Sequence, residues 1–247
     1  MKKMLILGIA AGLLAFACAA HAYPTLSGPT GEAVLPTAAV VPAGEFNVAA
    51  DFYNSETPDS SVPVRVLYGI SNNFEIGAGY TFVSDANTWG VNAKYATPLN
   101  LAGFGVGIGA RYASSDMPFD LTFNTTDVYA AGTKCFPLGE GTTLSGTVGL
   151  DWTFIDFADD NTSVLRPYLA AEVTLSNKLT LAAEYQFEND NVDVDGGVYA
   201  ISARYPIADN LGAQVGFTNV TPFTNASLDN GNFFIGANYV FGTAAEK

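Results

Sequence analysis

The sequence has 247 residues, of which 49% are hydrophobic and only 14% are charged. Acidic residues outnumber basic residues by 24 to 10, which gives a net charge of −14. Proteins that hold a phosphate backbone need clustered Lys and Arg, so no nucleic-acid partner is expected. The length suits one domain, and no linker or low-complexity run divides the chain.

Residues 1–22 have the pattern of a secretory signal peptide. Two lysines precede an apolar run over residues 4–20, and the triplet Ala20-His21-Ala22 predicts cleavage before Tyr23. The alternatives are a membrane-spanning helix, for which the run is short, and a lipoprotein anchor at Cys18. Cleavage would remove two basic residues and the only histidine, so the mature chain would carry 8 − 24 = −16.

From Gly44 onward the chain has the period of β-strands. Apolar residues alternate with small or polar residues in segments of about ten residues that end in turn sequences. In residues 74–83, for example, the large apolar side chains share one face and Glu75 lies on the other. We predict twelve strands, over 45–53, 62–70, 74–83, 88–97, 103–113, 127–137, 143–155, 164–175, 179–188, 197–206, 211–220 and 232–241.

The connections between these segments alternate between tight turns and longer, mostly acidic loops. The long loops are predicted at 54–61, 84–87, 114–126, 156–163, 189–196 and 221–231. Short turns on one side, long loops on the other and an even number of strands are typical of an outer-membrane barrel. We therefore expect both termini on the periplasmic side.

Charged residues inside the predicted strands have the parity opposite to the apolar face. They are expected to line the lumen of an all-β, antiparallel, up-and-down transmembrane barrel: Asp51, Arg65, Glu75, Lys94, Arg111, Lys134, Asp151, Arg166, Glu172, Glu184 and Arg204. A bilayer enforces this separation, because a Lys or Arg facing lipid at mid-membrane costs ~2–4 kcal/mol. Asp127 has the apolar-face parity on this assignment, next to a loop. The alternative is a soluble sandwich or lipocalin-like barrel, whose outer face would be rich in Lys and Glu.

Aromatic residues recur near the predicted strand ends on the apolar face, often within a small-Ala-polar-Tyr phrase. They predict the aromatic girdles of a membrane barrel: Tyr80, Trp89, Tyr95, Tyr112, Trp152, Tyr185, Tyr205, Tyr239 and Phe241.

With this strand pattern and the alternating terminal segment from Asn232 to Phe241, the sequence resembles the small Gram-negative, porin-like outer-membrane β-barrels. The segment from Pro24 to Gly31, followed by Leu35-Pro36-Thr37-Ala38, is similar to the start of exopolysaccharide-associated outer-membrane barrels. The resemblance implies export, insertion by the barrel-assembly machinery, and contact with outer-membrane lipid and lipopolysaccharide. The expected parts are a signal peptide (1–22), a periplasmic segment or plug (23–43), the barrel (44–241) and a periplasmic tail (242–247).

No catalytic, metal or cofactor site is expected. Enzymatic barrels of this membrane use a histidine, and the mature chain has none. The run from Asn191 to Gly196 matches only the first half of a calcium loop, because its twelfth position is Ser202 instead of Glu.

Two functions follow from the pattern. The first is a narrow passive channel for small hydrophilic solutes, because twelve strands lie between filled and open barrels and inward glycines would leave space: Gly77, Gly79, Gly90, Gly105, Gly107, Gly109, Gly149, Gly212 and Gly216. The second is a non-conducting structural or surface-interaction barrel, or an accessory of polysaccharide export. Acidic outer loops predict a weak cation preference. Glu75 and Lys94 are predicted to lie close together on neighbouring strands.

Overall fold

The computed structural model describes residues 23–54, 60–83, 87–117, 121–157, 160–189, 197–223 and 227–242; at Met117 and 227–230 only the backbone is described. The predicted signal peptide lies outside these residues, as do a part of each predicted outer loop and all but Gly242 of the predicted tail. The described part contains no helix able to cross a membrane.

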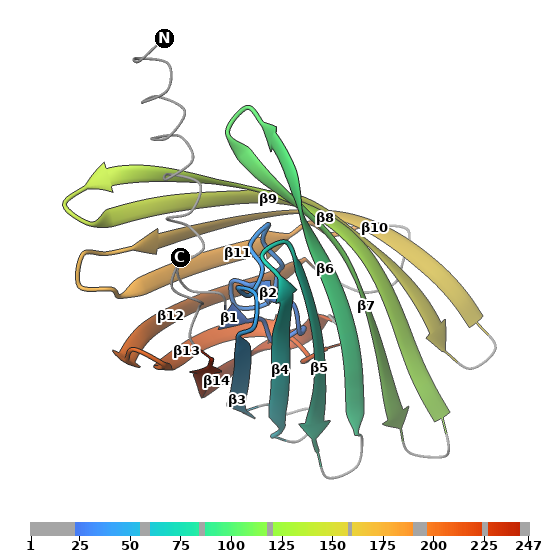
Figure 1. Ribbon diagram of the computed structural model, residues 1–247. Coiled ribbons are helices and arrows are strands. Elements are labelled where there is room, and N and C mark those ends of the chain that lie inside the picture. Colours follow the sequence, from blue (N-terminus) through green and yellow to red (C-terminus); the bar gives the residue numbers. More distant parts are fainter. Residues whose placement is uncertain are drawn as a thin grey trace.

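Twelve antiparallel strands form a closed barrel, which confirms the predicted fold (Figure 1). The strands are β3 (Phe46–Asn54), β4 (Val62–Ser71), β5 (Phe74–Phe82), β6 (Thr88–Leu101), β7 (Phe104–Met117), β8 (Leu121–Gly139), β9 (Thr142–Phe157), β10 (Asp160–Thr174), β11 (Thr180–Gln186), β12 (Val198–Ala208), β13 (Leu211–Val220) and β14 (Ser227–Phe241). Each strand pairs with its neighbours in sequence, and β14 closes the wall against β3, with Phe241 opposite Phe46. The strands β3 to β5 and β11 to β13 start and stop within about two residues of their predicted ends, because the period of two and the turn residues are local signals.

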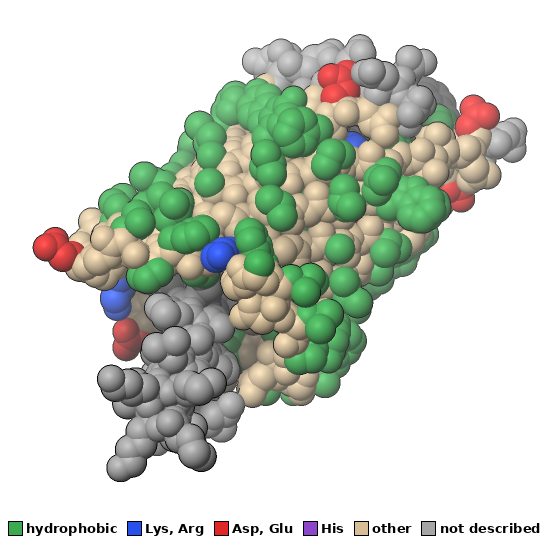
Figure 2. Space-filling model, turned by 90° about the horizontal axis from the view of Figure 1, so that it is seen from above, with side chains coloured by type: hydrophobic (Ala, Val, Ile, Leu, Met, Phe, Trp, Pro, Cys, Tyr) green, Lys and Arg blue, Asp and Glu red, His purple; other side chains and the backbone are tan. Residues whose placement is uncertain are grey.

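The outer face of the wall is apolar and the inner face is polar. In β5, Ile76 and Tyr80 are exposed, whereas Glu75 between Phe74 and Ile76 is fully buried. Figure 2 shows hydrophobic side chains spread over the wall, with acidic side chains toward its ends. The outer face of a water-soluble barrel would not expose so many Phe, Leu, Ile and Trp side chains. The surface matches the apolar band of a membrane barrel.

The strands from β6 to β10 are longer than the sequence predicts, so this part of the wall extends beyond the predicted strand ends. β7 and β8 pair as far as Met117 and Leu121, and β9 and β10 as far as Phe157 and Asp160. Most of the predicted loops 114–126 and 156–163 is therefore strand. These extensions are mostly polar and carry only scattered apolar residues such as Leu121 and Phe157, so the regular apolar alternation that marks a lipid-facing strand is missing from them.

The turn after β6 is also tighter than the predicted 98–102 connection. β6 runs to Leu101, and only Ala102 and Gly103 link it to β7, both with positive φ angles of 55° and 85°. Two successive positive φ angles are the signature of the two-residue hairpin turn that matches strand twist.

Residues 23–43 lie inside the barrel, where the blue segment of Figure 1 is enclosed by the strands. This segment, which we call the plug, begins with the small hairpin of β1 (Tyr23–Pro24) and β2 (Thr30–Gly31). Its apolar residues Leu26, Val34 and Leu35 are buried in a cluster with wall residues that include Tyr168 and Phe234. A strand wall does not require such a segment, so the plug is an added element of the lumen.

Candidate functional site: a plugged lumen

Ten of the eleven residues predicted to line the lumen have side chains on the inner face of the wall: Asp51, Arg65, Glu75, Lys94, Arg111, Asp151, Arg166, Glu172, Glu184 and Arg204. All are buried except Glu172, which is half-buried. Asp51 pairs with Arg65 and also accepts a hydrogen bond from Gln214. Glu75 and Lys94 lie opposite each other on β5 and β6, with Nζ 3.2 Å from the carboxylate, which confirms that prediction.

The assignment of Lys134 is wrong. In β8 the inward residues are Asp127, Tyr129 and Ala131, so Lys134 has the outward parity. It lies at the end of the wall that carries the tight turns, where Nζ donates to the Ala102 carbonyl at 2.9 Å and sits 5.4 and 5.5 Å from the rings of Phe104 and Phe136. A long lysine side chain reaches the membrane interface from such a position.

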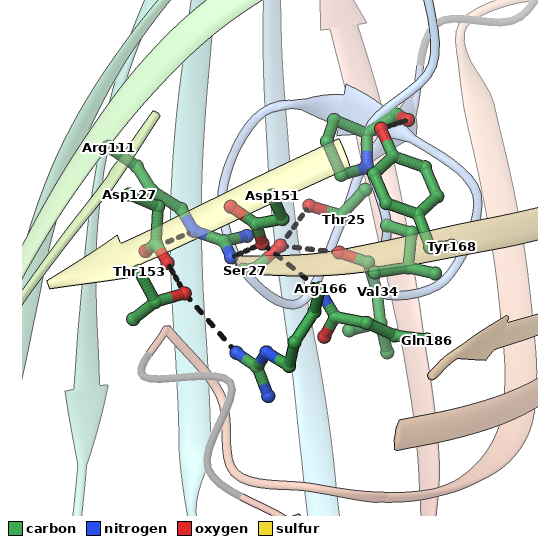
Figure 3. Close-up of polar contacts among 12 residues, drawn as sticks. Thr25, Ser27, Val34, Arg111, Asp127, Asp151, Thr153, Arg166, Tyr168 and Gln186 are labelled. Atoms are coloured by element: carbon green, nitrogen blue, oxygen red, sulfur yellow. Dashed lines mark hydrogen bonds and ion pairs between the residues drawn. The ribbon is translucent and has the colours of Figure 1, made fainter. Parts of the chain in front are cut away.

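The Asp127 side chain points into the lumen, although its predicted parity was that of the apolar outer face. It belongs to a network that joins neighbouring strands (Figure 3). Arg111 donates from Nε to Asp127 at 2.6 Å and from Nη2 to Asp151 at 2.8 Å. Thr153 donates to Asp127 at 2.5 Å and accepts from Arg166 at 3.2 Å, and Gln186 donates to Asp151 at 3.3 Å. We call these six residues the Arg111 network, and each of these hydrogen bonds joins one wall strand to another.

Glu184 holds the plug by its backbone. Its carboxylate accepts hydrogen bonds from the N–H groups of Ala33 (2.6 Å), Val34 (3.1 Å to each oxygen) and Leu35 (2.6 Å). These N–H groups converge because the chain turns at Glu32, whose N–H donates to the Leu35 carbonyl. Successive N–H groups that point to one place form an anion-binding nest, and Glu184 supplies the anion from β11.

Glu75 holds the plug from another part of the wall. It accepts from the Thr30 backbone at 2.9 Å, from the Thr30 hydroxyl at 2.5 Å and from the Val41 backbone at 2.8 Å. Its partner Lys94 donates to the Thr30 carbonyl at 2.6 Å. A carboxylate with three plug donors and a lysine beside it compensates the cost of burying its charge.

Further wall residues also bind the plug, among them Thr133 on β8, whose hydroxyl accepts from the Ala38 N–H at 3.0 Å. Arg204 donates to the Gly31 carbonyl at 3.1 Å and pairs with Glu172, and its guanidinium lies 4.8 Å from the Tyr23 ring centroid. The Tyr168 hydroxyl donates to the Pro36 carbonyl at 2.9 Å. The plug is therefore bound through its backbone by side chains from β5, β6, β8, β10, β11 and β12.

The inward glycines do not leave the space that the sequence analysis expected. At all nine positions a Cβ would meet other atoms within 4 Å. At Gly77 the space is filled by the side chains of Leu67 and Asn92. At most of the other positions an aromatic ring or the plug fills it: Phe223 covers Gly79, Tyr168 covers Gly149, and the plug residue Ala38 covers Gly107. Phe223 belongs to the connection between β13 and β14, and its N–H donates to the plug carbonyl of Leu26 at 3.2 Å. The glycines thus give room to what fills the lumen.

Glu32 is the one acidic side chain of the plug's 23–43 segment, and it is buried in the lumen. Neither carboxylate oxygen has a partner of ordinary hydrogen-bond geometry, although the Thr147 hydroxyl is near enough to favour the charged form. Burial raises the pKa of Glu32 well above its usual range, and the neighbouring Glu184 and Glu172 raise it further.

All nine residues predicted to form aromatic girdles lie on the outer face of the wall. Seven of them contact another aromatic ring: Tyr80, Trp89, Tyr112, Trp152, Tyr185, Tyr239 and Phe241. Trp89 and Tyr112 have ring centroids 5.3 Å apart near one end, and Tyr239 and Phe241 are 4.5 Å apart near the other. This is the placement that membrane interfaces favour for Trp and Tyr.

Comparisons with known proteins agree with the architecture. No protein-family model matches the chain, and no curated protein matches it. Solved structures are similar in fold: the KdgM porin (12% identity, TM-score 0.55, covering 80% of this chain and 99% of that chain), the NanC porin (13%, 0.54, 78% and 98%) and outer membrane protein Omp33 of Acinetobacter baumannii (14%, 0.53, 80% and 98%). The chain therefore shares the barrel fold of these solved outer-membrane proteins.

Within the described residues, no three His, Cys, Asp or Glu side chains are close enough together to hold a metal ion. The predicted calcium-like run at 191–196 lies outside those residues. The arrangement that the structure does show is a polar lumen, closed by a segment that is bound to the wall through buried carboxylates.

Proposed function

We propose that this chain is a narrow outer-membrane channel for small hydrophilic solutes, and that its own N-terminal plug closes the channel in the state described here. The observation that carries the proposal is that the plug fills the lumen without being part of the wall. Its path joins the barrel only at the start of β3, and its remaining contacts with the wall are non-covalent. The similarity in fold to proteins called porins supports it.

The plug is the kind of element that can leave. Most of its hydrogen bonds with the wall join its backbone to charged side chains. Water or a solute can take over such hydrogen bonds. The β14–β3 pairing, by contrast, starts after the plug ends and would persist without it. A bacterial outer-membrane location, with lipopolysaccharide and the barrel-assembly machinery as partners, belongs to this proposal.

The test is conductance in planar bilayers of the mature chain and of a variant that lacks residues 23–43. We expect rare, brief openings of the full chain and steady conductance of the variant. A synthetic peptide of residues 23–43 added to the variant should restore closure, and a scrambled peptide is the matched control. Heat-dependent mobility on gels shows that both barrels are folded.

The filled lumen also favours a second function, a non-conducting structural barrel or an accessory of polysaccharide export. Its core of buried apolar side chains, including Leu26, Leu35 and Phe234, is what a permanent plug would use. The same bilayer experiment separates the two. If the folded variant without the plug does not conduct, the channel proposal fails and the structural function stands.

A further inference from the structure

The plug carries an acidic group at a place where the wall is already acidic. Glu32 lies at the turn that Glu184 binds, so the two carboxylates belong to one small region of the lumen. Glu172 of β10 is a third carboxylate within electrostatic reach. Arg204 of β12 is a cation that acts on Glu32, but it already donates to Glu172 and to the Gly31 carbonyl.

The wall carboxylates near the plug have hydrogen-bond or ion-pair partners, whereas neither oxygen of the plug residue Glu32 accepts a hydrogen bond of ordinary geometry. Glu184 accepts from three N–H groups, Glu75 pairs with Lys94, and Glu172 pairs with Arg204. A buried, ionised carboxylate without such partners is costly, and the group avoids the cost by taking up a proton. The seated plug therefore requires Glu32 to be neutral.

We infer that Glu32 makes the plug a proton-controlled gate, which is seated while this carboxyl is protonated and leaves the lumen when it ionises. The inference rests on the proposed function. In the seated state Glu32 is buried beside Glu172 and Glu184; once the plug leaves, it is hydrated and far from both. The seated plug thus holds one proton more than the released plug over a range of pH.

The sign of the pH dependence follows from this difference. Because burial raises the pKa of Glu32 in the seated state, seating is strongest below the ordinary value of 4.5 and weakens as pH rises above it. The channel should open toward alkaline pH. One linked proton changes the ratio of released to seated plug by at most about tenfold per pH unit within that range.

Every titratable or charged group that faces Glu32 must be considered. Those that act on Glu32 are Glu172 and Tyr168 on β10, Glu184 on β11 and Arg204 on β12, and Tyr23 on β1 contacts Arg204. Cleavage before Tyr23 would add an α-ammonium next to Gly31, and this group would lose its charge near pH 8. That loss removes a cation from an acidic region, so it acts in the same direction as ionisation of Glu32.

The experiment measures release of the plug as well as conductance. A cysteine at the buried position Ala33, in a Cys135→Ser background, reacts with a maleimide only when the plug has left the lumen. We expect the labelling rate and the conductance of the mature protein to rise together between pH 5 and pH 9, by roughly tenfold or more in total. Glu32→Gln should remove most of that rise and leave only the part that the N-terminal amine contributes near pH 8.

Two outcomes overturn the inference. A pH-dependent release that survives unchanged in Glu32→Gln would assign the titration to Glu184 or to the N-terminus. A plug that stays seated at pH 9 in the native protein would also overturn the inference. Glu32→Leu, which is also uncharged, checks the result if Gln disturbs the turn. The variant without residues 23–43 should conduct at every pH, so failure of the gate and failure of the channel are told apart.

Discussion

The lumen contains two sets of buried charges, and they differ in what they bind. In the Arg111 network, charged side chains of β7, β8 and β9 bind one another, so this set is complete without the plug. Around the plug, Glu75, Lys94, Glu184 and Arg204 bind the backbone of a separate segment. The first set holds the shape of the wall, whereas the second holds something that the wall can release.

The largest expected effect comes from the plug contacts. Glu184→Ala leaves three plug N–H groups without an acceptor, at a cost of about 1–3 kcal/mol for each buried group. A loss of about 3 kcal/mol raises the released fraction roughly 100-fold. We expect a matching rise in conductance at constant pH, and a smaller one for Glu184→Gln, which keeps one acceptor oxygen. A Glu184→Ala channel as closed as the native one would show that apolar packing alone seats the plug.

A smaller effect on opening but a large one on stability is expected in the Arg111 network. Arg111→Ala leaves Asp127 and Asp151 buried without their cation, which should lower the free energy of unfolding by about 3–5 kcal/mol. Urea unfolding of the barrel in liposomes measures this change. The control combines Arg111→Met with Asp127→Asn and Asp151→Asn, which removes the uncompensated charge and should recover most of the loss.

The same variant tests the comparison itself. If the two sets are independent, Arg111→Ala should unfold more easily while its plug remains seated at neutral pH. If it opens the channel as much as Glu184→Ala does, then the wall network and the plug contacts form one cooperative unit.

The sequence predicts the wall far better than it predicts the lumen. Alternation and turn residues mark a strand within about ten positions of the sequence, so the twelve strands could be predicted from local sequence alone. The plug contacts join residues that are far apart, such as Leu35 to Glu184 and Val41 to Glu75, and no local pattern marks such pairs. The predicted alternatives for 23–43 therefore included a plug but not its binding residues.

β8 shows why one parity was assigned incorrectly. Val128 and Tyr129 are both large, and Ala130 and Ala131 are both small, so alternation there is weak. Tyr129 has the same parity as Asp127, so the predicted assignment implied that it faces lipid. In the structure it points inward, against Gly109, and the two charges of the strand exchange faces with it.

This correction leads to a prediction of intermediate size about the lipid face. Ala130 faces outward in the middle of β8, opposite Leu150, and Lys134 faces outward near the strand's end. Ala130→Lys should destabilise the folded barrel by about 2–4 kcal/mol, whereas Lys134→Leu should change the free energy of unfolding by less than about 1 kcal/mol. The measurement is again unfolding in liposomes. Equal effects at the two positions would place Lys134 deeper in the bilayer than its contacts indicate.

The smallest expected effect is ion selectivity, which the correction also changes. With Lys134 outside and Asp127 inside, the wall lines the lumen with five bases and six acids, and Glu32 adds a seventh acid while the plug is present. Three exposed acids, Asp116, Asp156 and Asp160, lie on the tall extensions of β7, β9 and β10.

Both the lumen and these extensions should raise the local concentration of cations, so the variant without residues 23–43 should prefer potassium over chloride weakly. Screening acts over ~10 Å at 0.1 M salt and ~3 Å at 1 M, so the preference should fade as salt rises. Reversal potentials in KCl gradients measure it. Replacing the three exposed acids by Asn should remove the part that salt screens most easily, while the lumen's share, set by buried side chains, persists. A preference for chloride at low salt would mean that Arg65 and Arg166 dominate the open pore, and that the wall charges rearrange once the plug has left.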